Sequence, residues 1–133
     1  MNATHTHRIT GIRTVGVPVP DQDRALGFYV GVLGFETRLD AAVPELGSRW
    51  IEVAPAGGAV SIALVQAHAG LPAGGESGVR FTTADAAALH AHLTAAGVDV
   101  DELISWPGVP PMFAFRDQDG NGLEIVQDAP GDW

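Results

Sequence analysis

Val17-Pro18-Val19-Pro20-Asp21 opens a stretch with helical spacing that ends at Leu33-Gly34-Phe35, and the same arrangement returns later in the chain. There Phe81-Thr82-Thr83-Ala84-Asp85 opens a second stretch, which ends at Ala96-Gly97-Val98. Self-similarity within one chain is the signature of an architecture built from copies of one unit. The sequence therefore predicts two similar modules.

Each module has an aspartate placed to cap a helix and a glycine placed to end it. Asp21 and Asp85 can accept hydrogen bonds from the backbone N–H groups of the first turn. Gly34 and Gly97 readily adopt the left-handed conformation that ends a helix. Strand-like segments surround each helix, at 12–19, 35–40, 48–54 and 59–66 and again at 78–83, 98–103, 111–116 and 122–127. Each module is expected to fold as βαβββ, which makes the chain an α+β protein.

The expected modules span residues 9–66 and 78–128, and the Gly- and Pro-containing segment 67–77 links them within a single domain of residues 1–133. A chain of this length is one domain on the usual prior. One helix cannot cover both faces of its sheet, so we expect the two half-open sheets to meet edge to edge as a cup-shaped mixed sheet. The place where the modules face each other is a natural ligand site.

Composition excludes several classes of function. The net charge is −9, and the chain has only seven Lys and Arg residues, which argues against a nucleic-acid partner. No apolar run approaches the ~20 residues needed to cross a bilayer, and no signal peptide is evident, so no membrane partner is expected. The chain has no cysteine, which removes disulfides and thiolate metal sites and is typical of a cytoplasmic protein.

Segments 17–36 and 115–121 resemble the vicinal oxygen chelate superfamily, which includes glyoxalase I, extradiol dioxygenases, methylmalonyl-CoA epimerase and the fosfomycin and bleomycin resistance proteins. The resemblance extends over residues 9–128 and implies the tandem βαβββ fold. It also implies a homodimer in which modules from two chains complete each cup. It does not define the reaction, because this fold hosts many chemistries and several non-catalytic binders.

Enzymes of that superfamily hold a divalent metal with four inward-facing strand positions, two in each module. Counting seven residues back from each capping aspartate places two of them at Thr14 and Gly78. The closing strands place the other two at Ala63 and Glu124. One carboxylate and one hydroxyl do not make a metal site, which needs several N, O or S donors. We therefore expect no cofactor and a metal-free cup, although an unusual divalent metal site stays open as an alternative.

Glu124 has two interpretations. In a partly dry cup its carboxylate could act as an acid or base, or hold a cationic group of a ligand. Alternatively, it forms a structural ion pair. Arg80 is the first candidate for that pair, because strand alternation places it on the same side as Gly78.

Large side chains offer walls for the cup, and Trp106 opens a stiff loop with three prolines that is expected at its rim. Phe113 and Phe115 alternate with Met112, so one of these two sets must fill the core instead. The ligand-binding residues expected from the sequence are Thr14, Trp50, Ala63, Gly78, Arg80, Trp106, Met112, Phe113, Phe115 and Glu124.

Residues 117–122 formally fit a calcium-binding loop, but strand-like segments flank them where an EF-hand needs helices. A hairpin turn is therefore the favoured interpretation, since Asp, Asn and Gly supply the backbone angles that turns need.

The first functional hypothesis is a metal-independent binding protein that holds a small aromatic or cationic compound in the cup, by analogy with the bleomycin resistance proteins. The alternative is a lyase, isomerase or dioxygenase of the same superfamily, with Glu124 as acid/base or as part of an unusual metal site.

Overall fold

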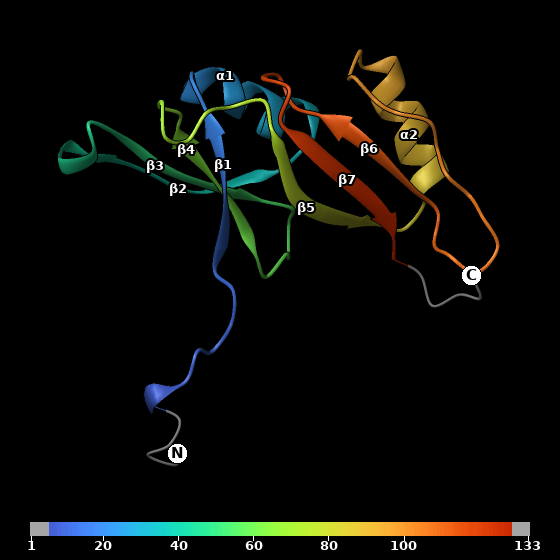
Figure 1. The fold of residues 1–133 in the computed structure, drawn as a ribbon, viewed down its shortest axis with the longest axis horizontal. Helices are drawn as coiled ribbons and strands as arrows, with labels where there is room; N and C mark the ends of the chain where they lie inside the picture. Colours follow the sequence, from blue (N-terminus) through green and yellow to red (C-terminus); the bar gives the residue numbers. More distant parts are fainter. Residues whose placement is uncertain (1–5, 129–133) are drawn as a thin grey trace.

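The computed structural model describes residues 6–128 and confirms two βαβββ modules in tandem (Figure 1). The first module contains β1 (Thr14–Val19), α1 (Gln22–Leu26) continued by a π-helix (Gly27–Val32), β2 (Glu36–Val43), a 3-10 turn (Pro44–Leu46), β3 (Ser48–Ala54) and β4 (Ser61–Gln66). The second contains β5 (Glu76–Thr83), α2 (Ala86–Ala95), β6 (Met112–Arg116) and β7 (Gly122–Gln127).

The helix boundaries follow the capping residues read from the sequence. The Asp21 carboxylate accepts a hydrogen bond from the backbone N–H of Arg24 at 3.1 Å, and the Asp85 carboxylate accepts one from Ala88 at 3.0 Å. Gly34 and Gly97 have φ angles of 79° and 81°, in the left-handed region that favours glycine. The caps therefore define where each helix starts and stops.

The strands form two separate sheets with matching topology, ordered β1-β4-β3-β2 and β5-β7-β6. In each module the first strand pairs in parallel with the last, and the remaining pairs are antiparallel. Each sheet is thus mixed, as expected. The described strands of one sheet do not hydrogen-bond to those of the other, so the cup is not one continuous sheet within the chain.

The strand expected at residues 98–103 is wrong as a regular element. The segment does run along β6, but only through isolated bridges that join Val100 to Phe115 and Ile104 to Met112. The two bridge positions are four residues apart on this segment and three apart on β6. An extra residue on one side breaks the ladder as a bulge does.

The connection between the modules is shorter than expected. β5 begins at Glu76, so the linker covers residues 67–75 rather than 67–77. Among residues 6–128, no helix is long and apolar enough to cross a membrane.

One hydrophobic core joins both modules on the helix side of the sheets. Phe35, which follows the first helix, packs edge-on against Phe81 of β5 with ring centroids 5.3 Å apart. Burial of apolar surface from both modules in one core couples their stability. The fully buried side chains that form it include Val17, Tyr29, Leu64, Leu93, Phe113, Phe115 and Leu123.

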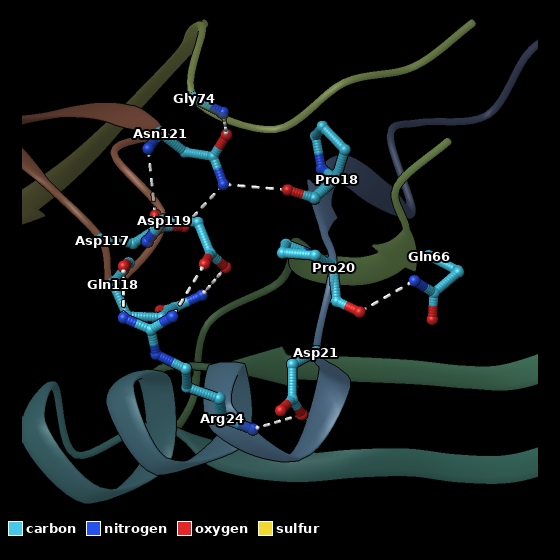
Figure 2. A network of polar contacts seen from close by, with 10 residues as sticks. All are labelled: Pro18, Pro20, Asp21, Arg24, Gln66, Gly74, Asp117, Gln118, Asp119 and Asn121. Atoms are coloured by element: carbon cyan, nitrogen blue, oxygen red, sulfur yellow. Dashed lines mark hydrogen bonds and ion pairs between the residues drawn. The ribbon is translucent and has the colours of Figure 1, made fainter. Parts of the chain in front are cut away.

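The turn between β6 and β7 supplies a second, polar connection between the modules (Figure 2). The Asp117 carboxylate is buried, and its Oδ1 accepts the backbone N–H groups of Asp119 and Asn121 at 2.9 and 3.0 Å. Its Oδ2 accepts the Tyr29 hydroxyl at 2.8 Å and the Asn121 amide at 2.9 Å. The carboxylate therefore has four donors within the protein, and residues 117–121 form the turn of a β-hairpin, as expected.

Two further contacts extend this turn across the module boundary. Asn121 donates to the Pro18 carbonyl of β1 at 2.9 Å and accepts the backbone N–H of Gly74 at 2.8 Å. Arg24 of α1 donates from Nη2 to the Gln118 carbonyl at 3.0 Å. Burial, followed by the nearby Asp117 charge, raises the pKa of Tyr29, so its hydroxyl stays protonated as a donor.

Loss of the Asp117 carboxylate should destabilise both modules together. Asp117→Ala leaves four donors unpaired in a buried place, and we expect the free energy of unfolding to fall by about 3 kcal/mol or more. Tyr29→Phe removes one of these bonds and should cost about 1–2 kcal/mol. Urea unfolding followed by circular dichroism measures both values. Glu102→Ala, at an exposed position, is the matched control, and an Asp117→Ala value equal to that control would contradict the account.

Candidate functional site

Each sheet has one face against the helices and one face away from them. Ile51 and Val53 of β3 lie in the core with Ala25 and Tyr29 of the first helix, so the alternate side chains of β3 point to the other face. We call this other side the open face. In the first sheet it carries Thr14, Trp50, Glu52, Ser61 and Ala63, and in the second it carries Gly78, Arg80, Met112, Ala114 and Glu124, as the strand registers place them.

The four positions expected to hold a metal in the superfamily do not form a ligand set. The Thr14 hydroxyl already donates to the Ser61 carbonyl at 3.2 Å. Ala63 offers a methyl group and Gly78 no side chain, which leaves Glu124 as the one usual ligand. No cluster of three or more His, Cys, Asp or Glu side chains suited to a metal occurs in the described part of the chain. These residues do not fit the metal that the superfamily implies.

Gly78 could not easily be replaced by a metal-ligating residue. Its φ angle is 76°, and the β5–β7 register shifts between Glu76 and Val79. A Cβ atom here would have open space around it, but a side chain is strained at positive φ. The bulge in β5 is therefore incompatible with a histidine in relaxed geometry.

The open face of the second sheet carries an ion pair between Arg80 and Glu124, which are direct neighbours across β5 and β7. Arg80 Nε donates to Glu124 Oε2 at 2.9 Å, and the two side chains are 64% and 37% exposed. The structural ion pair considered from the sequence is present. An exposed pair of this kind contributes little to stability.

Glu52 was missed in the sequence analysis, although it is the most enclosed carboxylate of the open faces. It is 4% exposed and accepts hydrogen bonds from Trp50 Nε1 at 2.8 Å, Ser61 Oγ at 2.7 Å and Arg13 Nε at 3.2 Å. The bonds from Trp50 and then Ser61 hold the pKa of Glu52 below its usual value. The available signal was strand alternation, which places residues 50 and 52 on one face.

Each open face carries a carboxylate in the equivalent cross-strand pair, but on a different strand of that pair. In the first sheet Glu52 is paired across the strands with Ala63. In the second, Ala114 is paired with Glu124. Each sheet thus has one acid and one alanine in the same cross-strand pair, but the acid lies on β3 in one module and on the closing strand in the other.

The expected aromatic walls divide between the open faces and the core. Trp50 and Met112 lie on the open faces, and Trp106 is 66% exposed in its proline-containing loop. Phe113 and Phe115 point the opposite way and are 2% and 0% exposed within the core. They are the set that fills the core, although Phe115 also borders a small cavity beside α2.

A cavity of about 640 Å³ lies between the modules. The β3–β4 turn and residues Val15 and Ile62 line it from the first module, and residues 77–82 of β5 line it from the second. Arg80 is the only charged residue that lines it, and the other lining residues are apolar apart from Ser77 and Thr82. A second cavity of about 240 Å³ shares Phe81 and Thr82 with it and extends toward α2. The larger volume matches the range typical of small-molecule sites.

Comparison with known proteins gives a family and several similar structures. The family model described as the Glyoxalase/Bleomycin resistance protein/Dioxygenase superfamily matches residues 11–125. A search of curated proteins finds no match.

Among solved structures, TnmS3, an antibiotic binding protein from Streptomyces sp. CB03234, is 34% identical, with a TM-score of 0.81 over 91% of this chain and 98% of that one. A superfamily member from Sphaerobacter thermophilus DSM 20745 is 30% identical, with a TM-score of 0.83 over 90% and 98%. Lactoylglutathione lyase from Agrobacterium tumefaciens is 21% identical, with a TM-score of 0.67 over 90% and 95%. This last likeness shows the shared fold alone.

The lowered pKa of Glu52 predicts a pH-dependent contribution to stability. The pKa of this carboxylate is lower in the folded state than its ordinary value of 4.5, so its ionised form stabilises the fold at pH values above 4.5. This contribution is lost as the pH falls from 4.5 through the lower folded-state pKa. Glu52→Gln should lower the free energy of unfolding by about 1–2 kcal/mol at neutral pH and by much less near pH 3. Denaturant titrations from pH 3 to pH 7 measure the difference. Glu45→Gln, at an exposed position, is the control, and a pH-independent Glu52→Gln effect would count against this role.

Proposed function

Because the chain belongs to the Glyoxalase/Bleomycin resistance protein/Dioxygenase superfamily, we propose that it binds a small molecule in the cavity between its modules, without a metal. The observation that carries the proposal is a cavity of about 640 Å³ whose walls come from both modules. Similarity to an antibiotic binding protein supports a drug-like ligand. The bound compound would be held and released rather than converted.

Metal independence is supported by the chemistry of the four corner positions. Thr14, Ala63 and Gly78 supply one hydroxyl between them, and Thr14 already uses it for a backbone carbonyl. Glu124 is paired with Arg80. A divalent metal needs more donors than this set provides.

The enzymatic alternative has weaker support. A carboxylate that acts as a general acid normally lies in a dry environment that favours its neutral form. Glu124 instead is 37% exposed and lies 2.9 Å from a guanidinium nitrogen. This exposed and paired setting differs from the dry setting of a general acid, and no observation in the described residues favours a lyase, isomerase or dioxygenase over a binder.

A homodimer is the second part of the proposal. The open faces belong to separate sheets, so a second copy is the natural element to complete a cup over each. Residues 6–12 also run away from the sheets (Figure 1), with Ile9 96% and Ile12 70% exposed. Sedimentation equilibrium tests this: we expect twice the 13.8 kDa chain mass, and a monomer at micromolar concentration would contradict it.

A thermal-shift screen of antibiotics, thiol adducts and acyl-CoA compounds tests the binding function. We expect at least one compound to raise Tm and to be recovered unchanged. Ala59→Trp places a large side chain at an exposed position that lines the cavity. This change should lower the affinity for that compound by about tenfold or more. Ala87→Trp, exposed on α2, is the matched control. Conversion of the compound to product, or equal binding by Ala59→Trp, would overturn the proposal.

A further inference from the structure

Arg80 uses its guanidinium group differently from four other arginines of the chain. Arg24, Arg38, Arg49 and Arg116 each donate from both Nη atoms to carbonyl or carboxylate oxygens. Arg80 instead makes one hydrogen bond within residues 6–128, from Nε to Glu124. Neither of its Nη atoms has a protein acceptor in that described part of the chain.

The bond to Glu124 orients the free part of Arg80. A guanidinium offers two hydrogen-bonding edges, one formed by Nε with an Nη atom and the other by the two Nη atoms. Because Glu124 accepts from Nε at 2.9 Å, the edge formed by the two Nη atoms stays available for another partner. That edge matches the two oxygens of a carboxylate or another oxyanion.

Arg80 is the only charged residue lining the cavity between the modules, and Glu124 does not line it. The remaining walls are mainly apolar, with Val15, Ile62 and Val79 among them. A cation with unused donors beside an apolar space favours a ligand with an apolar body and an anionic or strongly electron-rich oxygen group.

We propose that Arg80 anchors an oxyanion of the ligand, so that the protein selects apolar compounds bearing a carboxylate, phenolate or similar acid over cationic ones. This inference rests on the proposed function and replaces the cationic ligand expected from the sequence. The role of Glu124 is then to position Arg80 rather than to touch the ligand.

The first module contains the same arrangement outside the cavity. Arg13 donates from Nε to Glu52 at 3.2 Å, its Nη atoms have no acceptor within residues 6–128, and its side chain is 76% exposed. The two pairs are alike in their contact, although neither the arginines nor the carboxylates occupy equivalent positions of the two modules. In a dimer that completes the cup, Arg13 would offer a second set of N–H donors for the same ligand class.

Three matched naphthalene probes test the proposal on the purified full chain: 2-naphthoate, neutral 2-naphthylmethanol and cationic 2-naphthylmethylamine. Calorimetric titrations at about 0.15 M salt screen the long-range effect of the net charge of −9. We expect 2-naphthoate to bind at least about tenfold more tightly than the amine. Such a ratio is of the size expected for one charge-assisted hydrogen-bonding contact.

Variants separate Arg80 from general charge effects. Arg80→Gln should lower the affinity for 2-naphthoate by about tenfold or more, while changing the affinity for the neutral alcohol by less than about twofold. Arg8→Gln, which removes the same charge at an exposed position, should leave both affinities nearly unchanged. Glu124→Ala removes the carboxylate that positions Arg80, so it should also weaken the binding of 2-naphthoate while leaving that of the neutral alcohol nearly unchanged. If Glu124 itself held a cation, the same variant would weaken the amine.

The outcomes distinguish this inference from the proposed function. Binding of the neutral alcohol without preference for 2-naphthoate would overturn the Arg80 site and leave the binding function standing. Equal losses from Arg80→Gln and Arg8→Gln would also overturn it. Failure of all three probes to bind would contradict the Arg80 site, whereas the screen of antibiotics, thiol adducts and acyl-CoA compounds tests the binding function separately. Melting curves of each variant show whether a loss of affinity reflects unfolding.

Discussion

The Asp117 carboxylate is the interaction on which the relation between the two modules depends. It is buried among four protein donors, one of them the Tyr29 hydroxyl from the first module. A buried charge is tolerated only when its hydrogen-bonding capacity is satisfied. The turn that carries it must therefore keep one conformation. Through Asn121, this turn also donates a hydrogen bond to the Pro18 carbonyl of β1. This polar connection and the shared aromatic core both join the two modules. Together they fix the relative position of the modules whose residues line the cavity.

The two modules share their backbone features more closely than the polar side chains on their open faces. Both modules keep the capping aspartate, the helix-ending glycine and the parallel pairing of first and last strands. The polar groups on the open faces have diverged, with one acid on β3 and the other on β7. Backbone caps satisfy N–H groups in any protein with this fold, whereas side chains on an open face are constrained mainly by what they bind.

The fold could be read from the sequence because its signals are local. Asp21, Asp85 and the glycines that end the helices act within a few residues of themselves. The irregular segment after Gly97 could not be foreseen, since its pairing depends on where β6 places its own hydrogen-bonding groups. Glu52 was overlooked for a related reason. Its importance comes from Arg13 and Ser61, which reach it only after β3, β4 and the residue before β1 come together.

The central claim is that this duplicated frame holds a ligand without a metal. Metal analysis by inductively coupled plasma mass spectrometry, on protein purified without chelator, tests it most directly when paired with ligand titration before and after EDTA. The account predicts far less than one divalent metal per chain and the same ligand affinity in both titrations. One equivalent of nickel, zinc, iron or manganese, with binding lost in EDTA and restored by that metal, would contradict it.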